Sequence, residues 1–186
     1  QIGWSDLTDL AASPKGWGAA GHPEWGRFKL GKTNPNYSTS GLNATIATYF
    51  AATGLSSDLT LKHVADPQTR QFVQQLESSV AHYGDTTLTF LEHMANEAAA
   101  GKGLTYVSAV TVEEKSVLDY NQGNPTGDPA TAGQSPPPKI PLVAFYPDDG
   151  TLVSDNPWIV LDAPWVDEPK RQAAGDFLAW LKQPEQ

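Results

Sequence analysis

The chain has 186 residues, of which 39% are hydrophobic and 18% charged, a balance typical of one globular domain or slightly more. A formal net charge of −9 repels nucleic acid and anionic membranes, and no basic run exceeds the pair Lys170 and Arg171. The sequence therefore excludes both partners. The absence of cysteine excludes disulfides and thiolate chemistry.

No apolar run reaches the roughly 18 residues of a membrane-spanning helix. The first residue is Gln1, and no basic region followed by an apolar region comes after it. We therefore expect the sequence to start downstream of any signal or inside a longer protein.

The first half of the chain predicts helices joined by polar loops. A short helix is expected over residues 5–12, followed by a loop rich in Gly, Pro and Trp and a short strand at 28–31. A helix of small and apolar residues is expected over 41–53. The segment 66–80 predicts another helix with Pro67 in its first turn, and its apolar face would comprise Phe72, Val73, Leu76 and Val80.

The second half alternates helices and apolar runs. A helix is expected to begin near Asp85 and Thr86, a buried strand to cover 104–110, and a helix to follow over 112–121. Residues 123–139 are rich in Gly, Pro, Asp, Thr and Ser and predict a long surface loop.

The C-terminal part predicts extended segments and a last helix. "IPLVAFYP" is the most strand-like segment of the chain, and "TLVSDNPWIVLD" predicts two shorter extended pieces. Residues 168–181 predict an amphipathic helix with Ala173, Phe177, Leu178 and Leu181 facing inward. The alternation as a whole indicates an α/β fold, a three-layer sheet with flanking helices.

Gly16, Gly18 and Gly21 match the dinucleotide-binding pattern G-x-G-x-x-G, but that motif requires a strand before it and a helix opening within it. Here a predicted helix precedes it and "HPEW" follows, which favours an irregular loop. The four histidines never occur at a metal-binding helical spacing. We therefore predict neither a metal site nor a cofactor.

Catalysis has little support in the sequence. "STSG" and "GLSSD" lack the G-x-S-x-G nucleophile turn, although a catalytic triad built from distant residues is not excluded by sequence. Glu113 and Glu114 fall in the first turn of a predicted helix, where acidic side chains complement the helix dipole. Capping is the favoured interpretation of this pair over general acid or base chemistry.

The segment "GKTNPNYSTSG" places hydroxyl and amide side chains directly before the helix at 41–53. A turn of this kind would direct free N–H groups and hydroxyls at one point near the positive end of the helix dipole. It predicts either a small anion or carboxylate site or a helix cap with more hydroxyls than capping needs. The candidate residues are Thr33, Asn34, Ser38, Thr39, Ser40 and Gly41.

Two further helix starts are expected near the same edge of the sheet, because ligands of open α/β sheets gather at the carboxyl ends of the strands. The candidate residues there are Tyr83, Asp85, Thr86, Thr111 and Glu113. A ligand with a negative end and a positive or hydroxyl-rich end, such as an amino acid or a sugar derivative, would suit these side chains. A bare inorganic anion would be repelled by Glu113.

Four segments together carry a resemblance to a known family: "LGKTNPNYSTSGLNA", "LESSVAHYGDTTLTFL", "SAVTVEEKSVLDYN" and "IPLVAFYPDDGTLVSDNPWIVLDAPWVDEPKRQAAGDFLAWL". They are similar to bacterial extracellular solute-binding proteins of the type 2 periplasmic-binding-protein fold. The likeness is greatest to the branch that precedes a von Willebrand factor A domain in actinobacterial proteins, and it covers nearly the whole chain.

This resemblance implies a domain that binds a small polar ligand without catalysis, in a secreted protein or one anchored at the outer face of the membrane. Asn34, Pro35, Ser38, Ser40 and Gly41 match a turn that lies at the interlobe cleft in the family. The same resemblance places hinge strands near 31–33 and 144–147, which brings Tyr146 to the cleft. An alternative is a structural or protein-interaction module beside an adhesion-type domain, with solute binding lost.

The resemblance also divides the chain into a second lobe, residues 1–139, and a return segment with a C-terminal helix, residues 140–186. Most of the first lobe of the family has no counterpart in the sequence. We therefore expect apolar surface at the lobe interface to be exposed and to drive homodimer formation, with the C-terminal segments exchanged between chains.

Overall fold

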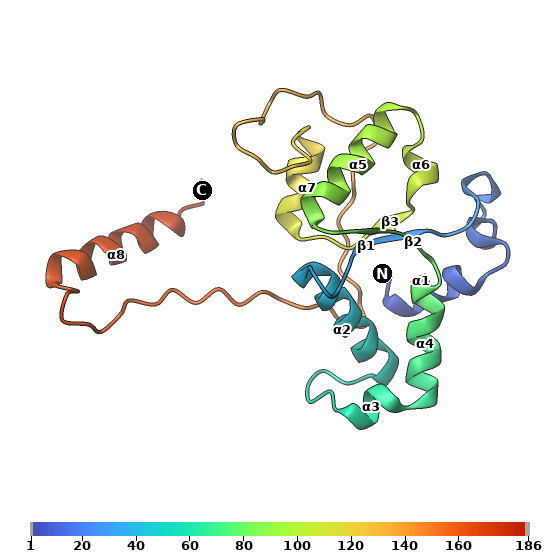
Figure 1. Ribbon diagram of the computed structural model, residues 1–186, viewed down its shortest axis with the longest axis horizontal. Coiled ribbons are helices and arrows are strands. Elements are labelled where there is room, and N and C mark those ends of the chain that lie inside the picture. The colour runs from blue at the N-terminus through green and yellow to red at the C-terminus, as the bar shows by residue number, and fades with distance from the viewer. Residues whose placement is uncertain (1, 185–186) are drawn as a thin grey trace. The chain divides into compact units, whose positions relative to one another are not determined.

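The computed structural model describes residues 2–184 and divides the chain into two compact units, Gln1–Leu152 and Val153–Gln186. The first unit has three layers, with a small sheet between two groups of helices (Figure 1). The predicted α/β class with flanking helices is therefore confirmed for this unit. The first unit includes residues 140–152.

The sheet consists of β1 Leu30–Thr33, β2 Val80–Gly84 and β3 Ala109–Val110 in the order β2-β1-β3. Both pairings are parallel, with Thr33 opposite Gly84 and Gly31 opposite Val110. The carboxyl ends of the strands therefore meet at one edge, and every residue of β1 is buried. The predicted strand at 28–31 is thus present but lies two residues further along the chain.

One face of the sheet is covered by α1 Trp4–Ala12, α2 Thr39–Thr53 and α4 Pro67–Glu77, with the short α3 Leu61–Ala65 between α2 and α4 (Figure 1). The small residues Ala44 and Ala47 of α2 pack in the same core as large apolar side chains. The buried core of this layer comprises Trp4, Leu7, Phe28, Leu30, Ala44, Ala47 and Leu76.

The other face is covered by α5 Thr87–Ala99, α6 Gly103–Tyr106 and α7 Glu114–Asn121. Gly31 and Gly84 let the ring of Phe90 approach the strands, because a Cβ atom on Gly31 would lie 2.4 Å from that ring. The buried core on this side comprises Phe90, Leu91, Met94, Val107 and Tyr120.

The glycine motif lies in a loop of two short 3-10 helices, η1 Gly16–Ala20 and η2 Pro23–Trp25. Trp17 ties this loop to the rest of the unit by donating from its indole Nε1 to the Ser108 hydroxyl at 2.9 Å. No strand precedes the motif, and no α-helix opens inside it, at these residues. The prediction of an irregular loop is confirmed.

Two predicted element boundaries were wrong. The helix expected over 66–80 ends at Glu77, because the hydroxyls of Ser78 and Ser79 bond to carbonyls of the last turn, and Val80 begins β2. The strand expected over 104–110 is reduced to β3, because α6 occupies residues 103–106. The second error concerns a short apolar run, for which periodicity does not separate helix from strand.

The strand predicted for "IPLVAFYP" was also wrong: the segment is extended but forms no ladder among the described residues. It runs beside α7, where the side-chain amide of Asn121 donates to the Leu142 carbonyl at 2.9 Å and accepts from the Leu142 amide at 2.7 Å. Pro141 and Pro147 lack an N–H donor, which weakens any ladder here. The extended pieces expected within 151–162 likewise form no strand.

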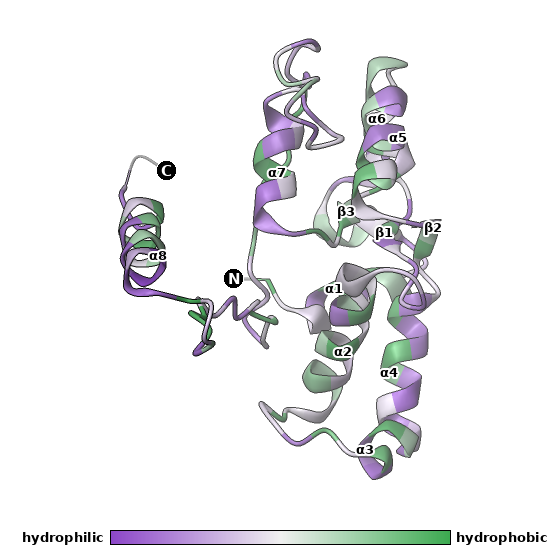
Figure 2. Cartoon of the chain, turned by 60° about the vertical axis from the view of Figure 1, so that its left-hand side comes forward, coloured by the Kyte–Doolittle hydropathy of each residue, from purple (hydrophilic) through white to green (hydrophobic). Residues whose placement is uncertain are grey.

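The second unit contains α8 Glu168–Leu181, with the bounds expected from the sequence. The inward orientation predicted for its apolar residues was wrong within this unit. Phe177 and Leu181 are 50% and 43% exposed, Ala173 is exposed and Leu178 is half-buried. Hydrophobic positions lie along α8 in Figure 2, and Phe177 contacts Trp158 and Trp180.

A turn near the end of the first unit caps its first helix. The Asp149 carboxylate accepts from the backbone N–H groups of Trp4, at 2.8 Å, and Ser5, at 3.0 Å, and from the Ser5 hydroxyl at 3.2 Å. The Trp4 indole donates to the Gly150 carbonyl at 3.2 Å. A carboxylate that satisfies the free N–H groups of a helix start stabilises it, so α1 depends on residues at the far end of the unit.

We predict that Asp149→Ala lowers the free energy of unfolding by about 1–2 kcal/mol, because it removes a charged helix cap. Asp155→Ala, which removes an exposed aspartate, serves as the control and should change stability little. Urea denaturation followed by far-UV circular dichroism measures both. Equal stabilities of the two variants would contradict the capping role.

Candidate functional site

The candidate site lies at the carboxyl edge of the sheet, where β1 ends at Thr33 and α2 begins at Thr39. Thr33 is only 1% exposed. Gly41, in the first turn of α2, allows the helix to approach the strand closely, since a Cβ atom there would lie 2.1 Å from the Thr33 carbonyl oxygen. The glycine of the "STSG" run is therefore required by packing at this position.

A chain of hydroxyl groups joins the starts of three helices at this edge. Thr33 Oγ1 donates to Ser38 Oγ at 2.8 Å, and Ser38 Oγ donates to Ser40 Oγ at 3.5 Å. Ser40 Oγ lies 2.9 Å from Thr87 Oγ1 in the first turn of α5, and it donates to the carboxylate of Glu113 at the start of α7. We call Thr33, Ser38, Ser40, Thr87 and Glu113 the hydroxyl–carboxylate cluster.

The direction of these hydrogen bonds is fixed by the carboxylate, which is acceptor-only when ionised. Ser40 gives its proton to Glu113, so its oxygen accepts from Ser38 and Thr87. Ser38 is the N-cap residue of α2 but makes no side-chain capping bond. The hydroxyls of the run thus bond to one another. The Ser38 side chain does not accept from the backbone N–H groups in the first turn of α2.

Four of the predicted site residues therefore come together: Thr33, Ser38, Ser40 and Glu113. Thr87 also belongs to the cluster but was not predicted, because the candidates named at this helix start were Tyr83, Asp85 and Thr86. Thr86 does cap α5 by accepting from the Thr89 N–H at 3.2 Å. The neighbouring Thr87 is directed toward Ser40 of α2. Its position one residue after the cap Thr86 is the sequence signal that could have indicated this.

The other predicted residues have separate places. The Asn34 side chain closes a local turn by accepting from the Asn36 backbone N–H at 3.0 Å, and Thr39 and Asp85 are exposed. Thr111 donates its N–H to the Gly31 carbonyl at 3.1 Å, while its hydroxyl oxygen is buried with no partner among the described residues. Tyr146 donates its hydroxyl to Glu114 at the start of α7.

Comparison with known proteins assigns the chain to a family. The sequence profile of bacterial extracellular solute-binding proteins matches residues 4–186. The chain belongs to this family. Comparisons with curated proteins and with solved structures gave no match.

Membership of the solute-binding family supports ligand binding without catalysis and a place outside the cytoplasm. Within residues 2–184, no helix is both long and apolar enough to cross a membrane. The same residues contain no group of His, Asp or Glu side chains arranged to hold a metal ion.

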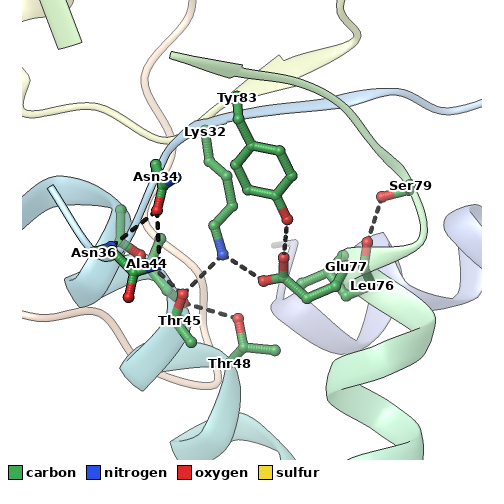
Figure 3. A network of polar contacts seen from close by, with 11 residues as sticks. Lys32, Asn34, Asn36, Ala44, Thr45, Thr48, Leu76, Glu77, Ser79 and Tyr83 are labelled. Atoms are coloured by element: carbon green, nitrogen blue, oxygen red, sulfur yellow. Dashed lines mark hydrogen bonds and ion pairs between the residues drawn. The ribbon is translucent and has the colours of Figure 1, made fainter. Parts of the chain in front are cut away.

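A second polar cluster of this solute-binding protein lies on the α2 and α4 face of the sheet (Figure 3). Lys32 on β1 is 2% exposed, and its Nζ donates to Thr45 Oγ1 at 2.8 Å and pairs with the Glu77 carboxylate. The other oxygen of Glu77 accepts from the Tyr83 hydroxyl at 2.5 Å. The predicted site residue Tyr83 therefore bonds to this pair and is not hydrogen-bonded to the hydroxyl–carboxylate cluster.

The ion pair and its two hydrogen-bond partners link four elements: Lys32 lies on β1, Thr45 on α2, Glu77 on α4 and Tyr83 on β2. A buried ammonium is tolerated only when it is paired and hydrogen-bonded, so loss of Glu77 would leave an uncompensated charge. Sequence analysis missed Lys32 because lysine is rarely buried. The available signal was a charged residue in the middle of an otherwise apolar strand, "LGKT".

The Tyr83 hydroxyl has a raised pKa, caused first by desolvation and then by its hydrogen bond to the Glu77 carboxylate. In the unfolded chain the pKa is about 10. The folded state therefore holds this proton more tightly, so its contribution to stability is present below pH 10 and is lost as the pH rises above that value.

We predict that the free energy of unfolding of Tyr83→Phe falls less steeply above pH 10 than that of the unsubstituted chain. Tyr37→Phe, at a tyrosine that is 79% exposed, is the control and should keep the original slope. Urea denaturation at several pH values between 8 and 11 gives the slopes. Identical slopes for the original chain and Tyr83→Phe would show that the Tyr83–Glu77 bond does not hold the proton.

Proposed function

We propose that this solute-binding domain holds a small polar ligand at the hydroxyl–carboxylate cluster and carries out no catalysis on it. The observation that supports this most is the convergence of the starts of α2, α5 and α7, joined through Ser40. Ligands of open α/β sheets bind at the carboxyl ends of strands, which is where this cluster lies.

The chemistry of the cluster suits a ligand with several polar groups. The starts of α2, α5 and α7 supply partial positive charge and N–H donors, which favour an anionic or carbonyl oxygen. The hydroxyls can donate or accept, and Glu113 accepts only. Asn34, Thr39, Gly41, Asp85, Thr86 and Thr111 belong to the proposed site as residues of the same turns, and Tyr83 and Tyr146 as residues of its rim.

We further propose that residues 1–139 form the second lobe of a type 2 periplasmic-binding-protein fold, with 140–186 as the return segment and final helix. The support is the parallel sheet of the first unit and the extended course of residues 140–147 beside α7. In this proposal a first lobe covers the apolar side chains that the return segment exposes, such as Val143 and Ile159. Closure of two lobes would bury the ligand.

The wider setting is proposed from sequence similarity. The quoted segments resemble the actinobacterial branch in which this domain precedes a von Willebrand factor A domain, so we propose such a domain in cis. The protein would then be secreted or anchored at the outer face of the cell membrane. In this proposal the solute-binding domain delivers its ligand for transport.

A second candidate function is a structural or protein-interaction module in which solute binding has been lost. The exposed apolar side chains of the second unit favour it: Trp158, Ile159, Leu161, Trp165, Phe177, Trp180 and Leu181. Apolar surface of this kind is usually covered by another protein surface. If the domain is such a module, a homodimer formed through this surface is the interaction that can be tested with this chain alone.

Ser40→Ala should weaken ligand binding by about tenfold, because it removes the hydroxyl that joins the three helix starts. Isothermal titration calorimetry with sulfate, phosphate, the protein amino acids and simple sugars identifies the ligand and measures the change. Ser57→Ala, at an exposed serine bonded only to Asp58 among the described residues, is the control. Equal affinities of the two variants would place the ligand elsewhere, and binding of none of these compounds would favour the module.

Sedimentation velocity tests the homodimer. We predict a dimer at concentrations of about 100 μM, because an apolar surface of this size drives association. Phe177→Glu together with Leu181→Glu should return the chain to a monomer, whereas Gln172→Glu with Lys182→Glu, at a polar position of α8 and at its C-cap, should not. A strict monomer at every concentration would contradict the prediction.

A further inference from the structure

The loop that follows α7 ends in three consecutive prolines, residues 136–138, which belong to neither of the polar clusters described above. Proline holds φ near about −65°, and a residue that precedes proline is restricted to the β and polyproline II regions. Ser135, Pro136 and Pro137 each precede a proline, so the run favours a polyproline II helix. In the structure, residues 136–138 are accordingly neither helix, strand nor turn.

Two of the three prolines present their rings to solvent. Pro136 and Pro137 are exposed, whereas Pro138 is half-buried. A polyproline II helix has about three residues per turn, so one edge of the run lies against the protein and the other two are free. The next residue, Lys139, is exposed and forms no ion pair within residues 2–184. The run therefore offers two proline rings followed by a free positive charge.

The proline run is held in place on both sides. Gly123, which is buried and has a φ of 80°, packs against its start, since a Cβ atom there would lie 2.4 Å from the Ser135 carbonyl oxygen. Beyond its end, the Asn121 side chain donates to the Leu142 carbonyl at 2.9 Å and accepts from the Leu142 amide at 2.7 Å. The run therefore has little conformational freedom left to lose on binding.

The part of the loop before the prolines is ordered by a buried asparagine. The Asn124 backbone N–H donates to the Asp119 carbonyl at 2.8 Å. Its side-chain oxygen accepts from the Thr126 hydroxyl at 3.4 Å and from the Thr131 hydroxyl at 3.2 Å. Compact surface loops that are packed by their own side chains are frequently functional. This loop thus forms a fixed support for the proline run.

We infer that residues 135–139 form a docking site for a protein domain whose groove is lined by aromatic side chains. Such grooves bind proline-rich segments and exploit the low entropy of a preformed polyproline II helix. The contacts of Gly123 and Asn121 reduce the entropic cost further, because the segment is already held in an extended conformation. The inference goes beyond solute binding and does not depend on it. The loop follows the end of α7, whereas the hydroxyl–carboxylate cluster lies at its start.

The test measures binding of the whole chain to purified SH3, WW and EVH1 domains, which carry grooves of this kind. Isothermal titration calorimetry with each domain at up to about 1 mM gives the dissociation constants. Pro136→Ala with Pro137→Ala removes the exposed rings. Pro129→Ala with Pro164→Ala is the matched control, because it also removes two exposed prolines but neither adjoins another proline. Circular dichroism checks that both variants are folded.

We expect at least one of these domains to bind the original chain. Pro136→Ala with Pro137→Ala should weaken this binding at least about tenfold, and the control by less than about twofold. Asn121→Ala keeps all the prolines but releases Leu142, so it should weaken binding by about threefold to tenfold.

The absence of binding to every domain, or equal affinities of the two proline variants, would overturn the inference. Unchanged affinity in Asn121→Ala would contradict the contribution of the held segment. Binding of sulfate, phosphate, amino acids and sugars should be the same in both proline variants, so the outcome for solute binding is measured separately from the outcome for docking.

Discussion

The burial of β1 on both faces is the constraint on which the first unit depends. This strand of four residues pairs with β2 and β3 and is covered by helices on each side. Leu30 belongs to the core under α1, α2 and α4, and Gly31 leaves room for the Phe90 ring of the core under α5. Thr33 ends the strand at the candidate site. A change in the register of β1 would therefore disturb both cores and the site together.

Lys32 shows how such a strand accommodates a charge. Its position in β1 directs the side chain to the α2 and α4 face, where Glu77, Thr45 and Tyr83 enclose it. A buried ion pair of this kind adds little net stability compared with apolar residues of similar shape. Its geometry is specific, however, since it requires α4 to end where Glu77 reaches the strand. The pair thus fixes the position of α4 relative to the sheet.

The hydroxyl–carboxylate cluster combines two opposing electrostatic effects. Three helix starts favour negative charge, whereas Glu113 places a negative charge among them. In the described structure the Glu113 carboxylate accepts from the Ser40 hydroxyl and makes no capping bond to α7. In the proposed function, a ligand at this edge would exchange hydrogen bonds with the hydroxyls of the cluster.

The two units differ in how their apolar residues are used. The first unit buries part of its aromatic and aliphatic side chains in two cores, one on each face of the sheet. The second unit has α8 and an extended segment, and its large apolar side chains remain exposed. A segment of this length does not form an independent core, because too little of its surface can be buried. Its helix and extended segment therefore leave these apolar side chains in contact with solvent.

The sequence by itself determined the α/β class, the positions of most helices, the surface loop over 123–139 and the presence of polar side chains at the helix starts. These features depend on local periodicity, on capping residues and on Gly and Pro, all of which can be identified within a few neighbouring residues. The tertiary structure alone decided that Val80 begins a strand, that residues 103–106 form a helix and that 140–147 forms no ladder. It also decided that Ser40 meets Thr87 and Glu113, that Asp149 caps α1 and that Lys32 is buried against Glu77. Each of these depends on residues far apart in the chain, whose distance is set by packing and is not encoded in any local pattern.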